Sequence, residues 1–253
     1  MEKKKIDTYK GFEQGPIRPP SEASSLLIRL TRNCPWNRCT FCRVYKKGKF
    51  SLRIVENIIK DIDVLHGYIE GVKRIVKPGG YAGSEVINTL YNSFKEKDRM
   101  AFNAAMSFYA SGMKSIFLQD ANSLIMKPDD LVFVLEHIKK CFPDVDRITS
   151  YARSHTIARI KQNDLQRMAR AGLNRIHVGM ESGSDIVLKK INKGTTKAVH
   201  IKAGLKVKQA GMELSEYVMP GLGGIEYSIE HALETASALN SINPDFIRIR
   251  TLA

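Results

Sequence analysis

The chain has 253 residues, of which 43% are hydrophobic and 26% are charged, and its 40 basic and 26 acidic side chains give a formal net charge of +14. This composition is ordinary for a globular protein of one large domain and excludes a low-complexity chain. No apolar run reaches the roughly 18 residues of a membrane-spanning helix, and the first twenty residues lack a secretory signal, so we expect a cytoplasmic protein with reduced thiols and no membrane partner.

The elements expected along the chain alternate between strands and helices. Six short apolar or β-branched runs predict strands at residues 26–31, 114–120, 147–152, 175–181, 214–221 and 245–252. Between them, residues 52–66 show a helical period, residues 128–140 begin with a proline, and residues 197–211 follow Thr196 and end at Gly211. Six such units predict an α/β fold, an open (β/α)6 partial TIM barrel with its helices on the outer face.

The expected domain organisation is simple. Residues 1–21 form an N-terminal extension whose lysine-rich start is expected to be disordered, and residues 22–253 form the barrel. Residues 66–112 exceed a normal crossover and predict a helical insertion, with a flexible turn at 77–83 and an extra helix that ends at Gly112. The chain stops directly after the sixth predicted strand, which leaves open whether it is a piece of a longer protein.

Unusual local sequences follow the predicted strands. NCPWNRCTFC (33–42) comes after the first strand, and QDANS (119–123), residues 151–153, ESGS (181–184), PGLGG (220–224) and Arg250 end the other five. Parallel barrels place their chemistry at the carboxyl ends of the strands. We therefore expect all six segments to meet at one rim.

The cysteine loop indicates a metal centre. Cys34, Cys39 and Cys42 are three of the four cysteines of the chain, and in a reducing compartment metal or redox chemistry explains them better than disulfides. A structural zinc site needs four ligands, and Cys141 is expected to be a small core residue rather than the fourth. A [4Fe–4S] cluster on three cysteines would keep one iron open to an external ligand.

The three-cysteine loop after the first strand of a (β/α)6 array resembles the radical S-adenosylmethionine (radical SAM) enzymes, over roughly residues 22–252. The resemblance implies that the open iron chelates SAM, and that an external one-electron reductant of the flavodoxin or ferredoxin type drives cleavage to methionine and a 5′-deoxyadenosyl radical. This radical would abstract hydrogen from a substrate. The CX4CX2C spacing is one residue longer than the commonest family spacing and resembles a subgroup described loosely as iron–sulfur oxidoreductases.

The resemblance also implies cofactor-binding residues, each with a simpler structural alternative. Asp120 and Asn122 stand where many members bind the SAM amino group, although the usual glycines are missing and an Asx turn would explain both residues. Glu181 would accept from a ribose hydroxyl, and Ser182 would donate to the methionine part, or serve the cap of the helix that follows Ser184.

Further contacts are implied on the other loops. Lys193 resembles the basic residue that faces the SAM carboxylate, or is simply solvated. Gly221 and Gly223 would let the main chain approach adenine, and Phe41 would shield the cluster edge or pack the loop. No Ser/His/Asp, HExxH or phosphate-loop pattern offers a competing catalytic account, and no catalytic residue is assigned.

The identity of the substrate stays open. The positive charge and the alternation of Arg248 and Arg250 with isoleucines suit an anionic substrate if the arginines, with Arg153, point into the barrel. RNA is a weaker partner prediction, because the basic residues are spread along the chain and a solvated lysine-rich surface explains them. The alternative function is a non-catalytic, zinc-stabilised basic domain that binds RNA. Whether SAM is consumed or regenerated is not determined.

Overall fold

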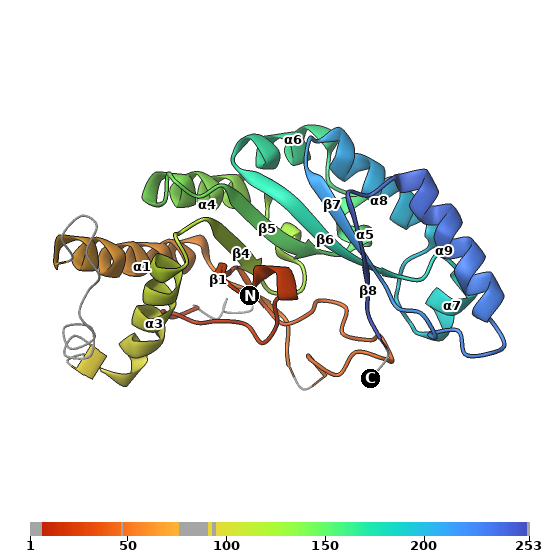
Figure 1. The fold of residues 1–253 in the computed structure, drawn as a ribbon, viewed down its shortest axis with the longest axis horizontal. Helices are drawn as coiled ribbons and strands as arrows, with labels where there is room; N and C mark the ends of the chain where they lie inside the picture. Colours follow the sequence, from red (N-terminus) through yellow and green to blue (C-terminus); the bar gives the residue numbers. More distant parts are fainter. Residues whose placement is uncertain (1–6, 47, 76–90, 93–94, 252–253) are drawn as a thin grey trace, which may run out of the picture.

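The structure is a computed structural model that describes residues 7–46, 48–75, 91–92 and 95–251. Six strands form one sheet in which every neighbouring pair is parallel. Their order is β1 (Leu26–Arg29), β4 (Ser115–Gln119), β5 (Arg147–Ala152), β6 (Leu173–Glu181), β7 (Glu213–Val218) and β8 (Phe246–Ile249). The sheet curves, and α4, α6, α8 and α9 lie along its outer side (Figure 1). The predicted open α/β barrel is confirmed.

The helices follow the predicted alternation. They are α1 (Val55–Ile75), α3 (Glu96–Ala110), α4 (Pro128–Cys141), α5 (Ser154–Ile157), α6 (Gln162–Arg170), α7 (Asp185–Lys190), α8 (Lys197–Gln209) and α9 (Ser228–Ile242), with short 3-10 turns at Pro20–Glu22 and Ser123–Ile125. The predicted boundaries of α8 are confirmed, because the Thr196 side chain accepts a hydrogen bond from the Val199 amide and Gly211 adopts a φ of 82°. None of the helices in these described ranges combines the length and the apolar composition needed to cross a bilayer.

A small antiparallel pair lies outside the main sheet. β2 (Thr31–Arg32) pairs with β3 (Ser51–Leu52), and together they close the base of the loop that contains the three cysteines. Two residues a side give no periodic signal in the sequence, and the pair was not predicted. Its effect is to fix both ends of the cysteine loop at one point.

The predicted insertion and extension are only partly within the described residues. α1 extends nine residues beyond the predicted end at residue 66, and α3 ends just before Gly112, whose φ is 80°. The predicted turn at 77–83 and the lysine-rich start lie outside the described residues. From residue 7 the predicted extension packs against the barrel: Phe12 is buried in the main core, and the Tyr9 hydroxyl donates to Asp61.

The two faces of the sheet have different compositions. The outer face is aliphatic and packs against the helices through residues such as Ile116, Leu118, Ile176 and Leu214. Because side chains alternate across a strand, the residues between them face inward, and these include Phe117, Tyr151, His177 and Tyr217. The inner face is therefore aromatic and polar rather than a closed hydrophobic core.

Candidate active site

A cavity of about 870 Å³ opens on the inner side of the sheet. Its walls come from the N-terminal segment 14–18, from the cysteine loop, and from the ends of the strands. Cys34, Cys39 and Cys42 all line it. Five of the six predicted rim segments therefore contribute to the cavity, whereas PGLGG (220–224) contributes no lining residue.

The three thiols are partly buried and influence one another. Burial raises the pKa of the Cys39 thiol, and Cys34 and Cys42 raise it further, whereas the positive charges of Lys193 and Arg153 oppose the increase. The backbone amide of Asn37 donates to the Cys34 sulfur at 3.4 Å. The three thiols thus line one cavity, and the charges of Lys193 and Arg153 act on Cys39.

The loop is irregular, and its shape is fixed mainly by hydrogen bonds to its backbone. Asn33 and Asn37 adopt positive φ values of 67° and 48°, a conformation that asparagine tolerates better than most residues. The Asn33 side chain donates to the Lys49 carbonyl and the Asn37 side chain to the Tyr45 carbonyl, both at 2.6 Å. Trp36 of the loop donates to the Asn192 carbonyl, which lies outside the loop, at 2.7 Å.

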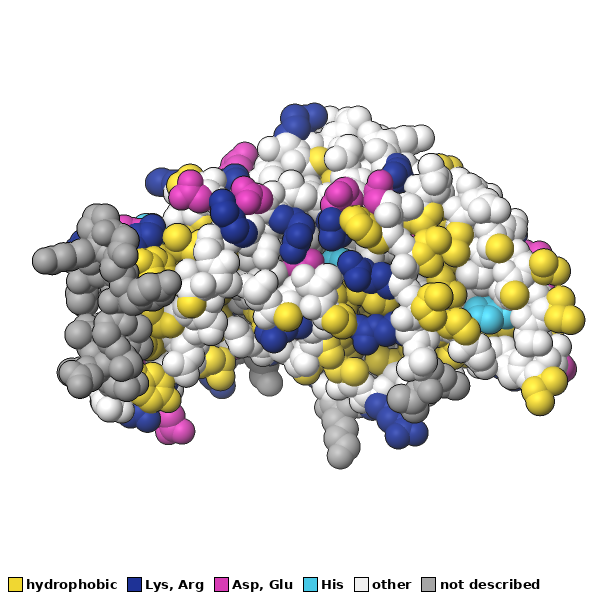
Figure 2. Space-filling model, in the orientation of Figure 1, with side chains coloured by type: hydrophobic (Ala, Val, Ile, Leu, Met, Phe, Trp, Pro, Cys, Tyr) yellow, Lys and Arg dark blue, Asp and Glu magenta, His cyan; other side chains and the backbone are white. Residues whose placement is uncertain are grey.

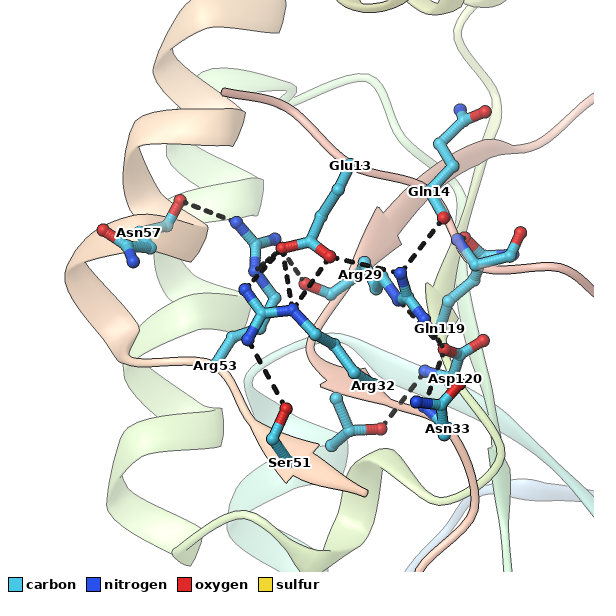
Figure 3. A network of polar contacts seen from close by, with 12 residues as sticks. Glu13, Gln14, Arg29, Arg32, Asn33, Ser51, Arg53, Asn57, Gln119 and Asp120 are labelled. Atoms are coloured by element: carbon cyan, nitrogen blue, oxygen red, sulfur yellow. Dashed lines mark hydrogen bonds and ion pairs between the residues drawn. The ribbon is translucent and has the colours of Figure 1, made fainter. Parts of the chain in front are cut away.

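A charged network supports the base of the loop (Figure 3). Glu13 forms ion pairs with Arg29, Arg32 and Arg53 at 2.6 to 3.1 Å. Arg29 also pairs with Asp120 at 2.6 Å. This network joins the N-terminal segment, β1, β2, α1 and the end of β4 directly beneath the cysteines.

Asp120 belongs to this network rather than to the cavity lining. Its side chain is fully buried, and its carboxylate accepts hydrogen bonds from Arg29, from the Asn33 amide at 3.1 Å and from the Tyr45 hydroxyl at 3.2 Å. The carboxylate thus fixes the loop through these contacts, and its predicted contact with a SAM ammonium group stays a prediction.

Four further predicted residues do not line the cavity. Asn122 is fully buried and bridges Thr156 and the Arg153 amide at 2.9 and 3.0 Å. Ser182 is also buried; its hydroxyl lies 2.7 Å from His231 Nδ1 and accepts from the Ser184 amide. Gly221 and Gly223 lie in the turn after β7, where Met219 is the residue that reaches the cavity. These residues position the rim. Asn122 bonds to Arg153 and Thr156 rather than forming the Asx turn that was its simpler alternative, whereas the contact of Ser182 with the Ser184 amide fits the helix-cap alternative.

Glu181, Lys193 and Phe41 do line the cavity. Lys193 Nζ donates to Glu181 Oε1 at 2.8 Å, and both side chains are nearly buried. Lys193 also lies 5.8 Å from the centre of the Phe41 ring. Gly179 makes room for the ion pair, because a Cβ there would overlap the Glu181 carboxylate. A carboxylate and an ammonium group are thus presented to the cavity next to an aromatic ring.

Arg153 stands between the cysteines and the Lys193 loop. It donates to the Lys193 carbonyl at 2.9 Å and stacks on Trp36 at 5.0 Å from the ring centre. Burial lowers the pKa of its guanidinium group, and the nearby Cys34 and Cys39 oppose that shift. The sequence did not determine which way the Arg153 side chain points. In the structure it faces the cavity.

None of the residues of the cavity floor was predicted as a binding residue, although Tyr151 lies in the predicted rim segment 151–153. The rings of Tyr151, His177 and Tyr217 lie 5.8 to 6.3 Å apart on three neighbouring strands. Beneath them, His177 Nε2 lies 3.4 Å from Glu22 Oε1, with both side chains fully buried. Burial lowers the pKa of the His177 imidazole, and the Glu22 carboxylate opposes that decrease. The only signal in the sequence was an aromatic or histidine side chain at an alternate position of each strand. These side chains become neighbours only through the strand register.

Positive charge predominates around the cavity. Its lining contains five basic side chains and one acidic one, Glu181; the basic ones are Arg18, Arg43, Arg153, Lys193 and Arg250. Arg248 and Arg250 both turn inward, towards Ser215 at 3.1 Å and the Tyr217 ring at 5.3 Å. Lys and Arg side chains also gather over the middle of the molecule in Figure 2. An anionic group would be favoured in this cavity.

Comparison with known families identifies the fold. The model of the Radical SAM superfamily matches residues 89–236, more than half of the chain. The chain belongs to the radical SAM superfamily. The matched range begins after the cysteine loop, so the CX4CX2C spacing takes no part in this assignment.

Individual relatives of this radical SAM protein are distant. It is 26% identical over 228 residues to 4′-phospho-dehydrooxetanocin synthase of Priestia megaterium, which covers 87% of this chain and 27% of the relative. It therefore spans about a quarter of the length of this curated relative.

Solved structures share the fold at low identity. They include coproporphyrinogen III oxidase of Escherichia coli (13% identity, TM-score 0.55, covering 90% of this chain and 44% of that one) and methylornithine synthase (13%, 0.53, 90% and 53%). The cobalamin-dependent S-adenosylmethionine radical enzyme OxsB is 20% identical, with a TM-score of 0.54, over 88% of this chain and 27% of that one. Membership of this superfamily supports an enzyme that uses an iron–sulfur cluster and SAM.

Proposed function

We propose that Cys34, Cys39 and Cys42 bind a [4Fe–4S] cluster and that the adjoining cavity binds SAM and a substrate. The observation that carries the proposal is that three of the four cysteines line one cavity, whereas Cys141 lies at the end of α4 and does not. Three thiolates suit a cluster with one open iron. Such a cluster, once bound and reduced, would supply the electron that cleaves SAM and starts hydrogen abstraction.

The residues of this chain would position SAM rather than perform acid–base chemistry. Glu181 can accept a hydrogen bond from a ribose hydroxyl on the face that Lys193 leaves free. Lys193 and Arg153 supply positive charge for the methionine carboxylate, close to the cysteines. Phe41 offers a flat apolar surface beside them. Asp120 and Asn122 fix the loop and Arg153 from behind, and Ser182 fixes the end of β6.

The substrate is proposed to be anionic. No ion pair joins Arg18, Arg43 or Arg250 to an acidic residue within the described ranges of the chain, and all three line the cavity. The SAM carboxylate is proposed to face Lys193 and Arg153, so it would leave these three arginines without an anionic partner. The aromatic floor of Tyr151, His177 and Tyr217 would exclude water beneath the substrate and limit side reactions of a carbon radical.

The test is anaerobic reconstitution with iron and sulfide, followed by dithionite and SAM. We expect about four irons per chain and formation of 5′-deoxyadenosine. A reconstituted protein that forms no 5′-deoxyadenosine, or that retains no iron, would refute the proposal. The alternative zinc-stabilised, RNA-binding domain predicts a colourless protein with zinc on the cysteine loop, and none of the comparisons supports it.

A further inference from the structure

A second group of metal-ligating side chains lies away from the cavity, between α1 and α4. Asp63 on α1, together with His137 and Cys141 on α4, brings a carboxylate oxygen, an imidazole nitrogen and a sulfur within 4.8 Å of one another. None of the three lines the cavity. Cys141 is the cysteine that the sequence analysis treated as a core residue, so the structure gives it two polar neighbours that the sequence did not reveal.

The fold brings these groups together in a defined way. His137 and Cys141 are four residues apart on one helix, so they share a face. His137 Nε2 lies 2.7 Å from Asp63 Oδ1 and 3.6 Å from Cys141 Sγ. Cys141 packs against the main core, whereas the Asp63 side chain is 56% exposed. An ion from solvent could therefore reach the cluster from the Asp63 side.

The separations approach those of a tetrahedral zinc ion. With Zn–N and Zn–O near 2.0 Å and Zn–S near 2.3 Å, ligand atoms lie about 3.3–3.8 Å apart. The distance between His137 and Cys141 is already in this range. The shorter distance between His137 and Asp63 would need to increase by about half an ångström, and the exposed Asp63 side chain can rotate by that amount.

Charge also favours an ion at this position. A carboxylate and a thiolate together balance the two charges of Zn²⁺, so the loaded site would be neutral. Cysteine binds a metal as the thiolate, so the Cys141 thiol must give up its proton to bind the ion. A bound metal displaces such a proton, and imidazole with thiolate selects zinc over magnesium or calcium.

We propose that Asp63, His137 and Cys141 form a zinc site, with water as the fourth ligand, that links α1 to α4. The simpler explanation is a hydrogen bond between His137 and Asp63 beside an inert thiol. The two accounts differ in whether the folded chain retains zinc with a single sulfur ligand.

The test uses the full chain with its iron–sulfur centre reconstituted, one equivalent of Zn²⁺ and subsequent desalting. Zinc-edge X-ray absorption reports on zinc without interference from iron. We expect about one zinc per chain, with one sulfur near 2.3 Å and the remaining nitrogen or oxygen ligands near 2.0 Å. Loss of the zinc on desalting would overturn the proposal. So would a spectrum with three sulfurs, because that would place the zinc on Cys34, Cys39 and Cys42.

Matched variants locate the ion. Cys141→Ser should remove the sulfur signal, and Asp63→Asn should weaken zinc affinity at least tenfold; both changes are small enough to preserve the fold. Glu136→Gln, which makes the same carboxylate-to-amide change at an exposed position of α4, should retain zinc like the unmodified chain. Equal loss in Glu136→Gln and Asp63→Asn would show that surface charge alone attracts the ion, and would refute the site.

Thermal stability provides an independent test of the proposed zinc site. Zinc at a hundredfold excess over its Kd should raise the Tm of the unmodified chain by about 5–10 °C. The same addition should leave the Tm of Cys141→Ser and His137→Ala nearly unchanged. A similar rise in all three proteins would contradict the proposed link between the helices.

Discussion

The cysteine loop and the cavity floor face the same space, yet different interactions position them. The described part of the loop, residues 33–46 and 48–50, has little regular structure, and side chains such as Asn33, Asn37 and Asp120 fix its backbone. The floor residues are held by strand register, which pairs Tyr151 with His177 and Gly179 with Tyr217. A change in one side chain should therefore disturb the loop strongly and the floor weakly.

The largest expected effect is loss of the metal centre. Cys39→Ala should abolish formation of 5′-deoxyadenosine and lower the iron content of the reconstituted protein, since two cysteines cannot hold the cluster. The control is the same change at Cys141, which does not line the cavity, and this variant should keep both iron and activity. Full iron content in Cys39→Ala would mean that the loop is not the cluster site.

Asp120→Asn tests whether the loop depends on the network beneath it. Removing the buried charge leaves Arg29 without its partner at 2.6 Å, and breaking a buried ion pair costs about 3 kcal/mol or more in the free energy of unfolding. Iron retention should fall with stability. In the control, Asp129→Asn removes an ion pair to Arg167 with an 82% exposed carboxylate, which should cost less than about 1 kcal/mol. Equal losses would contradict a special role for the network.

The helix layer behind the floor should make the protein sensitive to acid. His200 on α8 is fully buried with no hydrogen-bond partner among the described residues, and burial, with the charges of Lys193 and Arg153, lowers its pKa to about 3. Between the ordinary pKa near 6.5 and pH 3 the unfolded chain binds the additional proton. The stabilisation is therefore complete above pH 6.5 and is lost as the pH falls towards 3.

Denaturant unfolding at two pH values measures this effect. Lowering the pH from 6.5 to 5 should reduce the free energy of unfolding by about 1.5 kcal/mol through His200 alone. In His200→Leu, the decrease over the same interval should be smaller by that amount. An identical pH dependence in the variant and the unmodified chain would show that His200 is not the buried neutral group inferred here.

The same tyrosine-to-phenylalanine substitution, made once in the cysteine loop and once on the cavity floor, compares the two regions directly. The Tyr45 hydroxyl, at the end of the cysteine loop, donates to the buried Asp120 carboxylate, so Tyr45→Phe should cost about 1.5 kcal/mol. The Tyr217 hydroxyl, on the floor, faces Tyr151 and Arg250 without a hydrogen bond of ordinary geometry in the described structure, so Tyr217→Phe should cost less than Tyr45→Phe. Chemical denaturation checks both, and a larger loss in Tyr217→Phe would reverse the comparison.

The sequence predicted the parts of the molecule that depend on local patterns. The six parallel strands, the start of α4 at Pro128 and the cap of α8 at Thr196 follow from periodicity and capping chemistry. The cysteine loop was recognisable because its three thiols lie within ten residues. Family resemblance also pointed to Glu181 and Lys193, which the structure places together in the cavity.

Long-range pairing could not be predicted in the same way. Asp120 was predicted as a SAM contact because its position matches the family segment that binds the SAM amino group, but its carboxylate pairs with Arg29 of β1, which is 91 residues away. The floor residues Tyr151, His177 and Tyr217 stand on three strands and become neighbours only through the register. The buried contact between Glu22 and His177 joins the N-terminal segment to β6, and no local pattern indicates it.

Electron–nuclear double resonance of the reduced, reconstituted protein directly tests whether one iron of the cluster binds SAM. With SAM labelled at its amino nitrogen and its carboxylate oxygens, we expect magnetic coupling of both labels to the iron–sulfur signal, because three cysteines leave one iron for SAM. A signal that is insensitive to labelled SAM at saturating concentration, or coupling to a protein nitrogen in its place, would show that SAM does not bind this iron.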